Sequence, residues 1–127
     1  MGLTAFLSVG LGASIGAWLR WLLSIGLNTA FPLLPLGTLI ANMLGGYLMG
    51  LTMGFITLGG MVSPELRLLV ITGFLGGLTT FSTFSAESVS LISRGDYGWA
   101  SLHLLSHLLG SLLMTGLGLL TVQLLKS

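Results

Sequence analysis

The most polar stretch of the sequence runs from Gly73 to Glu87, inside a long apolar segment. Two adjacent glycines, Gly76 and Gly77, disfavour a continuous helix there. They are followed by five hydroxyl side chains, those of Thr79, Thr80, Ser82, Thr83 and Ser85. Freed backbone groups beside hydroxyls are typical of interrupted membrane helices that line an ion site. The alternative is an unbroken helix whose Ser and Thr bond back to carbonyls four residues earlier. The paired glycines and the length of the segment favour a break near residues 76–80.

A second set of polar residues recurs every four positions near the C-terminus: His103, His107, Ser111 and Thr115. On a helix this set spans about 18 Å along one slowly winding face. His103 and His107 have the spacing of a zinc-binding pair, but no third ligand is evident near them. We therefore interpret the two histidines as hydrogen-bonding residues of a pore or an interface.

Two ionisable residues, Arg20 and Glu87, fall within apolar segments, where a charge is costly and by default indicates function. The alternatives are an arginine that reaches toward the membrane surface and a glutamate at a helix end. Asn42 and the hydroxyls supply hydrogen-bond donors without charge. Phe81 and Phe84 lie inside the hydroxyl run, and the edges of aromatic rings are positive. Such neutral donors can replace the water that a small, hard anion sheds, so these residues indicate an anion path.

Motifs for catalysis are absent from the sequence. It has no phosphate-binding loop with a lysine, no serine nucleophile motif, no paired carboxylates and no cysteine. We therefore do not expect an enzyme.

The composition indicates that lipid surrounds the elements that position these residues. Only 6% of the 127 residues are charged, against about 25% in soluble domains. The hydrophobic share is 54% and the mean hydropathy is +1.05. A net charge of +1 provides no basic surface for nucleic acid. The chain is expected to be an integral membrane protein.

Four apolar segments are each long enough to span a bilayer: about residues 3–27, 37–58, 65–93 and 99–125. Short connections rich in Pro or Gly separate them. We expect one all-α membrane domain, residues 1–127, with four transmembrane helices and a broken third helix. Small residues recur every four positions in the first two segments, which predicts close helix packing.

The positive charges do not determine the orientation of these helices. Arg20 and Arg94 fall toward one side of the membrane, and Arg67 and Lys126 toward the other. This balance is compatible with a single orientation set by other features. It is equally compatible with dual topology, in which the chain inserts both ways and forms an antiparallel dimer.

Over nearly its whole length the sequence resembles the Fluc (CrcB) family of fluoride channels. The matching segments are Gly12 to Trp21, Gly37 to Gly46, Gly73 to Glu87 and Gly110 to Gly118, of which the third is the most specific. The resemblance implies a four-helix subunit in the bacterial inner (plasma) membrane. It also implies a dual-topology antiparallel homodimer with two fluoride pores, each built from both subunits.

The resemblance also implies which residues contact fluoride. Asn42 would contact the ion near a pore end, and Phe81 and Phe84 would line the route with their ring edges. The polar track beside them would consist of Ser82, Thr83, Ser111 and Thr115.

Three further roles follow from the same resemblance. The backbone carbonyls of Gly76 and Thr79 would hold a structural Na⁺ ion at the dimer centre. Arg20 would raise the local anion concentration in a vestibule. Glu87 would be a carboxylate of the pore region.

The implied function is passive export of fluoride, without ATP or covalent chemistry. The main alternative is a small proton-coupled exporter of organic cations, similar to the small multidrug resistance proteins. That chemistry needs an acidic residue in the first span, which has none. A non-transporting membrane scaffold would explain the glycine faces but leave the hydroxyls unused.

Overall fold

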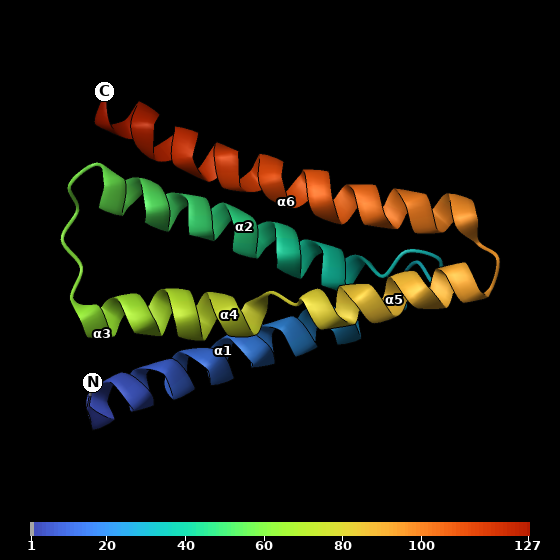
Figure 1. Ribbon diagram of the computed structural model, residues 1–127, viewed down its shortest axis with the longest axis horizontal. Coiled ribbons are helices and arrows are strands. Elements are labelled where there is room, and N and C mark those ends of the chain that lie inside the picture. The colour runs from blue at the N-terminus through green and yellow to red at the C-terminus, as the bar shows by residue number, and fades with distance from the viewer. Residues whose placement is uncertain (1) are drawn as a thin grey trace.

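The computed structural model describes residues 2–127, which form a bundle of long helices (Figure 1). The spans are α1 (Leu3–Leu27), α2 (Leu36–Thr57), a composite third span (Pro64–Ser93) and α6 (Tyr97–Lys126). Each is long and apolar enough to cross a membrane, which confirms the predicted all-helical architecture with four membrane spans. The fourth helix begins at Tyr97, where the sequence had predicted Trp99.

The third span is not a continuous α-helix. It consists of α3 (Pro64–Arg67), the π-helix η1 (Leu68–Leu75), α4 (Gly76–Leu78) and α5 (Phe81–Ser93). Between α4 and α5 the backbone is extended, so the third span is interrupted as the paired glycines predicted. The π-helix was not predicted, because an apolar run of eight residues does not reveal whether its N–H groups bond four or five residues back.

The spans pack as two close pairs, α1 along η1 and α4, and α2 along α6 (Figure 1). Glycines allow this approach. A methyl group on Gly16 would overlap the carbonyl oxygen of Phe74, and one on Gly50 would overlap the carbonyl oxygen of Thr115. The small-residue stripes therefore mark close helix contacts, as predicted.

Local signals explain where the helices begin and end. Pro35 immediately precedes α2, and the hydroxyl of Ser63 caps α3 by accepting the Leu66 N–H at 3.1 Å. Gly59 and Gly95, just beyond α2 and α5, have φ angles of +93° and +80°, a conformation that favours glycine. These turns return the chain, so that its two termini lie at one end of the bundle (Figure 1).

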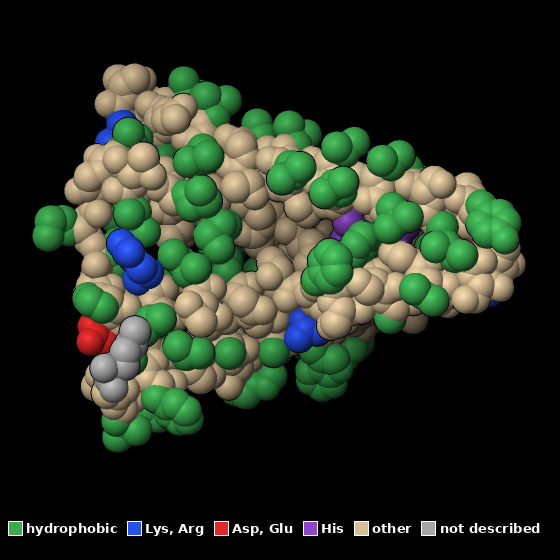
Figure 2. All heavy atoms as spheres, viewed as in Figure 1, with side chains coloured by type: hydrophobic (Ala, Val, Ile, Leu, Met, Phe, Trp, Pro, Cys, Tyr) green, Lys and Arg blue, Asp and Glu red, His purple; other side chains and the backbone are tan. Residues whose placement is uncertain are grey.

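The surface of the bundle is apolar. Figure 2 shows hydrophobic side chains over much of one face and few charged groups. Trp18 and Leu112 are 61% and 64% exposed, as expected for side chains that face lipid. The same view shows histidine recessed among the surrounding atoms, and the helix interruption lies in this part of the molecule.

Candidate functional site

The interruption of the third span is held by a side chain from another helix. The amide of Asn42, on α2, accepts a hydrogen bond from the Thr80 N–H at 2.8 Å and donates one to the Thr80 carbonyl at 3.1 Å. The two bonds replace partners that a continuous helix would have provided. Asn42 thus satisfies backbone groups that lipid could not.

The restart of the helix leaves two carbonyl oxygens without their α-helical donors. The Thr80 N–H, which would bond to Gly76, donates to Asn42 instead. The Thr83 N–H, which would bond to Thr79, donates to the Thr80 hydroxyl at 3.1 Å and caps α5. The carbonyls of Gly76 and Thr79 thus lack the donors that a continuous α-helix would supply, and they are the two carbonyls that the sequence resemblance implied as Na⁺ ligands.

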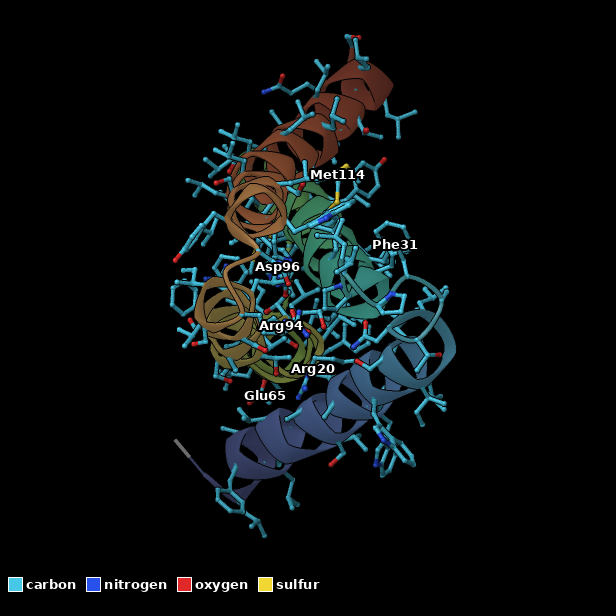
Figure 3. The ribbon with its side chains drawn as sticks, turned by 90° about the vertical axis from the view of Figure 1, so that its right-hand side faces the viewer. Arg20, Phe31, Glu65, Arg94, Asp96 and Met114 are labelled. Atoms are coloured by element: carbon cyan, nitrogen blue, oxygen red, sulfur yellow. The ribbon has the colours of Figure 1, made fainter. Side chains whose placement is uncertain are left out.

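Arg20 lies beside the same interruption. Its Nε–H donates to the carbonyl of Gly77 at 2.9 Å, across from α1 to α4. Figure 3 shows this side chain between α1 and the third span. The sequence had predicted a vestibule arginine, and the contact with a backbone carbonyl was not foreseen, because the two residues are 57 positions apart.

A cavity of about 470 Å³ brings most of the predicted residues together. Its lining includes seven of them: Asn42, Gly76, Thr79, Phe81, Phe84, Ser111 and Thr115. His107 also lines it, whereas Ser82 and Thr83 do not. The hydroxyls of Thr79 and Thr115 donate to carbonyls four residues earlier, at 2.8 and 2.9 Å. Hydroxyls of ordinary membrane helices bond in this way, and this bonding is the alternative that the sequence left open for the third span.

Aromatic rings continue from this cavity toward the histidines. Phe81 and Phe84 meet edge to face, with their ring centroids 5.6 Å apart. Phe84 in turn lies 4.5 Å from the His107 ring and 5.3 Å from the His103 ring. Phe81 is 79% exposed, so the rest of the chain leaves its outer face uncovered.

Glu87 lies beyond the histidines, at the middle of α5. Its Oε2 accepts a hydrogen bond from the hydroxyl of Thr38 at 2.7 Å, and its Oε1 is 3.4 Å from Nε2 of His103. Thr38 is itself held by the side chain of Asn28, which accepts the Thr38 N–H at 3.2 Å. Neither Thr38 nor Asn28 was predicted as a site residue, although Thr38 lies four positions before Asn42 on the same helix face.

A second cavity, of about 300 Å³, lies between the first connection and the second half of α5. Its lining consists of Pro32, Pro35, Ala86, Glu87, Ser90, Leu91 and Arg94. Arg94 lies just after α5 and is over half exposed. The two cavities and the side chains between them form a line of polar and aromatic groups. It leads from the interruption of the third span, past His107, His103 and Glu87, to the end of the bundle at Arg94.

Comparison with known proteins yields consistent matches. The family model described as CrcB-like protein, Camphor Resistance (CrcB), matches residues 7–119. Relatives named fluoride-specific ion channel FluC include one from Cupriavidus pinatubonensis, 62% identical over 98% of this chain and 99% of its own. Another, from Nitrosospira multiformis, is 56% identical over 97% of this chain and 96% of its own.

Proposed function

Because the chain belongs to the CrcB family, we propose that it is a fluoride channel. It lets fluoride leave a bacterial cell across the plasma membrane, down the electrochemical gradient. The observation that carries this function is the 470 Å³ cavity, in which neutral donors and ring edges from α2, α5 and α6 converge.

The chemistry of the cavity suits a small, hard anion. Fluoride loses most of its hydration in a narrow path, and the Asn42 amide and the Ser111 hydroxyl are uncharged donors that can replace that water. The positive edges of Phe81 and Phe84 add weak attraction, while the ring bodies exclude bulk water. No full positive charge lines this cavity to hold the ion in place.

The remaining polar groups extend the route. Fluoride passes from the cavity along Phe84 and the two histidines toward Glu87, and it reaches the membrane surface through the 300 Å³ cavity. Thr38 binds the Glu87 carboxylate, which leaves one carboxylate oxygen facing the histidines. Arg20 attracts anions to the region from beside the interruption, and an ion channel of this kind performs no catalysis.

The proposed functional unit is an antiparallel homodimer in which each pore uses both subunits. The exposure of Phe81 supports it, because a predicted pore residue lies uncovered on the single subunit. The even division of the positive charges supports insertion in both orientations. Reporters fused to the C-terminus should therefore appear on both sides of the membrane, and a signal from one side alone would contradict dual topology.

A Na⁺ ion at the dimer centre would be held by the carbonyl oxygens of Gly76 and Thr79 and the equivalent oxygens of a second subunit. Oxygen donors suit a hard cation, and both carbonyls lack their α-helical donors. Bound there, the ion would neutralise converging carbonyl dipoles and stabilise the dimer. Replacing Na⁺ by a large organic cation should lower the unfolding temperature of the dimer, and no change would argue against the site.

The test of the function is fluoride efflux from proteoliposomes that contain the purified protein, followed with a fluoride-selective electrode. Chloride efflux is measured in parallel. We expect fast fluoride release and little chloride release. Release of the two anions at equal rates, or no fluoride release, would refute the proposal.

A further inference from the structure

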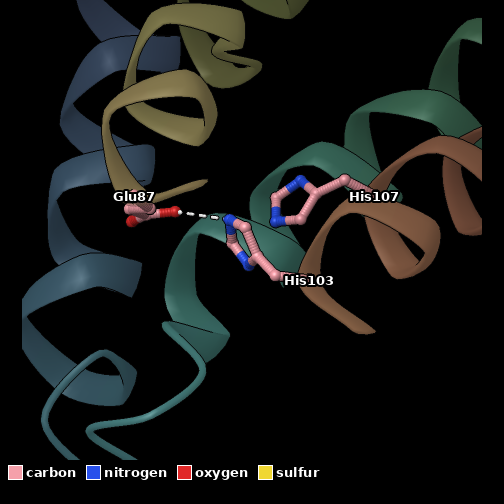
Figure 4. Close-up of side chains that lie close together, drawn as sticks. All are labelled: Glu87, His103 and His107. Carbon is pink, nitrogen blue, oxygen red and sulfur yellow. Dashed lines mark ion pairs between the residues drawn. The ribbon is translucent and has the colours of Figure 1, made fainter. Parts of the chain in front are cut away.

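Glu87, His103 and His107 form a three-residue cluster that the fluoride route alone does not explain. Glu87 lies on α5 and both histidines lie on α6 (Figure 4). One potential metal-ligand atom from each residue lies within 4.8 Å of those of the other two. The sequence showed a histidine pair without a third ligand, and the fold supplies that ligand from a different helix.

The cluster is buried and poorly satisfied by hydrogen bonds. His103 is fully buried and His107 is 4% exposed. Four atoms of the cluster have no hydrogen-bond partner in the described protein: both ring nitrogens of His103, Nε2 of His107 and Oε1 of Glu87. His103 Nε2 and Glu87 Oε1 are 3.4 Å apart but not aligned as a hydrogen bond. Buried polar atoms without partners are costly, so the arrangement favours a ligand that would satisfy several at once.

Thr38 orients the Glu87 carboxylate as an outer residue of a metal site does. Thr38 donates to one oxygen of Glu87 and leaves the other directed at His103. Asn42 reaches Nδ1 of His107 at 3.0 Å. Because the Asn42 amide is already oriented by Thr80, it presents an N–H to that nitrogen, so the uncharged His107 ring carries its proton on Nε2.

We propose that Glu87, His103 and His107 bind a divalent transition-metal ion, of which Zn²⁺ is the best match. Two imidazoles and one carboxylate are a common zinc ligand set with one coordination position left open. Hard ions such as Mg²⁺ prefer oxygen ligands and do not suit two histidines. The 300 Å³ cavity that contains Glu87 and Arg94 provides an entry path, and the ion pair of Arg94 with Asp96, at 3.4 Å, reduces the repulsion at its mouth.

A bound ion inhibits fluoride passage. A divalent cation with one carboxylate leaves a net positive charge among apolar side chains, and an anion in the open position neutralises it. Fluoride bound there is held rather than passed on. Coordination by His107 through Nδ1 removes its hydrogen bond with Asn42, which lines the proposed fluoride cavity. Coordination through Nε2 moves the ring proton to Nδ1, where it faces the Asn42 N–H and the bond is also lost. This inhibition rests on the proposed function, whereas the metal binding does not.

Binding is measured on the full chain without a histidine tag, in detergent, by titration calorimetry with Zn²⁺ and by the visible spectrum of added Co²⁺. We expect one Zn²⁺ ion per chain, displacement of Co²⁺ by Zn²⁺, and the intense absorption of tetrahedral Co²⁺. Mg²⁺ should not compete. Weak absorption typical of six oxygen ligands, or equal competition by Mg²⁺, would overturn the site.

Variants separate a ligand role from a structural one. Loss of a residue that only orients a metal ligand lowers metal affinity about 10–100-fold. Loss of a ligand itself should cost more, so His103→Gln should lower Zn²⁺ affinity by more than about a hundredfold. His103→Cys should retain binding and add a sulfur-to-cobalt charge-transfer band. Ser106→Ala, on the same helix, is the control and should bind like the parent. Should His103→Gln fail to fold, X-ray absorption of the zinc-loaded parent decides, because a first shell without imidazole would overturn the proposal.

Flux measurements test the inhibition. Zn²⁺ should slow fluoride efflux from proteoliposomes that contain the parent protein and have less effect on those that contain His103→Gln. If Zn²⁺ binds but efflux at saturating Zn²⁺ is unchanged, the inhibition is overturned and the metal site stands. Absence of efflux in metal-free buffer would refute the fluoride-channel function, and the Co²⁺ spectrum would still decide the metal site.

Discussion

The side-chain amide of Asn42 and the backbone of Thr80 bond in both directions, with Thr80 donating at 2.8 Å and Asn42 donating at 3.1 Å. A side chain from α2 thereby holds the one interruption within the spans of the described chain. The same pair orients the Asn42 amide, so its remaining N–H faces His107 at 3.0 Å. The helix interruption and the donors of the proposed path are therefore parts of one arrangement.

Replacing Asn42 with alanine should slow fluoride efflux and destabilise the subunit. The change leaves the N–H and carbonyl of Thr80 without their partner, at about 1–3 kcal/mol for each buried group. Efflux is measured in proteoliposomes, and stability by the unfolding temperature in detergent. Gln123→Ala, which removes an exposed amide from α6, is the control. An Asn42→Ala protein that still forms the proposed dimer and conducts at the parent rate would exclude Asn42 from the path.

Changing Phe81 to leucine should slow fluoride efflux with little effect on the stability of the subunit. Leucine keeps an apolar side chain but removes the ring edges, which we expect to lower the rate by up to about tenfold. Stability should be retained because Phe81 is 79% exposed in the subunit. Phe6→Leu, at a 75% exposed position of α1, is the matched control. Equal efflux from both variants would show that the Phe81 ring has no part in conduction.

Removing the hydroxyl of Thr38 should lower stability and fluoride efflux far more than removing an ordinary helix hydroxyl. Thr38→Val removes the 2.7 Å hydrogen bond to Glu87 and leaves that oxygen without its donor, at about 1–3 kcal/mol, and should also slow efflux. The control on the same helix is Thr52→Val, since that hydroxyl bonds only to the Leu48 carbonyl. Both variants are compared by unfolding temperature and by efflux. Similar losses in the two would mean that the bond to Glu87 has no special role.

Arg20→Gln should lower fluoride efflux most strongly at low ionic strength. In the proposed channel Arg20 attracts anions by its charge, and salt screens such attraction over about 10 Å at 0.1 M. Efflux is measured over a range of concentrations of an impermeant salt. Arg94→Gln is the comparison, because Arg94 is more than half exposed and already paired with Asp96. A loss of efflux that does not vary with salt concentration would show that Arg20 acts only through its bond with the Gly77 carbonyl.

Gly50→Ala should destabilise the contact between α2 and α6. The added methyl group would overlap the carbonyl oxygen of Thr115, and such overpacking costs about 1–3 kcal/mol. Gly116→Ala, one residue further along α6, adds a methyl group with nothing within 4 Å and should leave the stability unchanged or raise it. The unfolding temperatures of the two variants test this contrast. A Gly50→Ala protein as stable as the parent would show that α2 and α6 can move apart without loss of stability.

Several site features could be predicted only in part. The hydroxyl run after Gly77 and the even spacing from His103 to Thr115 predicted polar faces on two helices. Five of those residues line one cavity: Thr79, Thr80, His107, Ser111 and Thr115. Four do not: Ser82, Thr83, Ser85 and His103. The sequence could not reveal this, because a break between two helices resets the direction of every side chain that follows it.

By itself the sequence determined the four spans, the interruption of the third and the close approach of the glycine faces. Each follows from local properties: the length of an apolar run, the flexibility of adjacent glycines and the small size of residues repeated every four positions. Only the tertiary structure decided which polar groups meet. Asn42 and Thr80 are 38 positions apart, and the Glu87 carboxylate reaches the histidines from another helix. Such meetings depend on how each helix is rotated about its axis against its neighbours, and that rotation is set by the packing of the whole bundle.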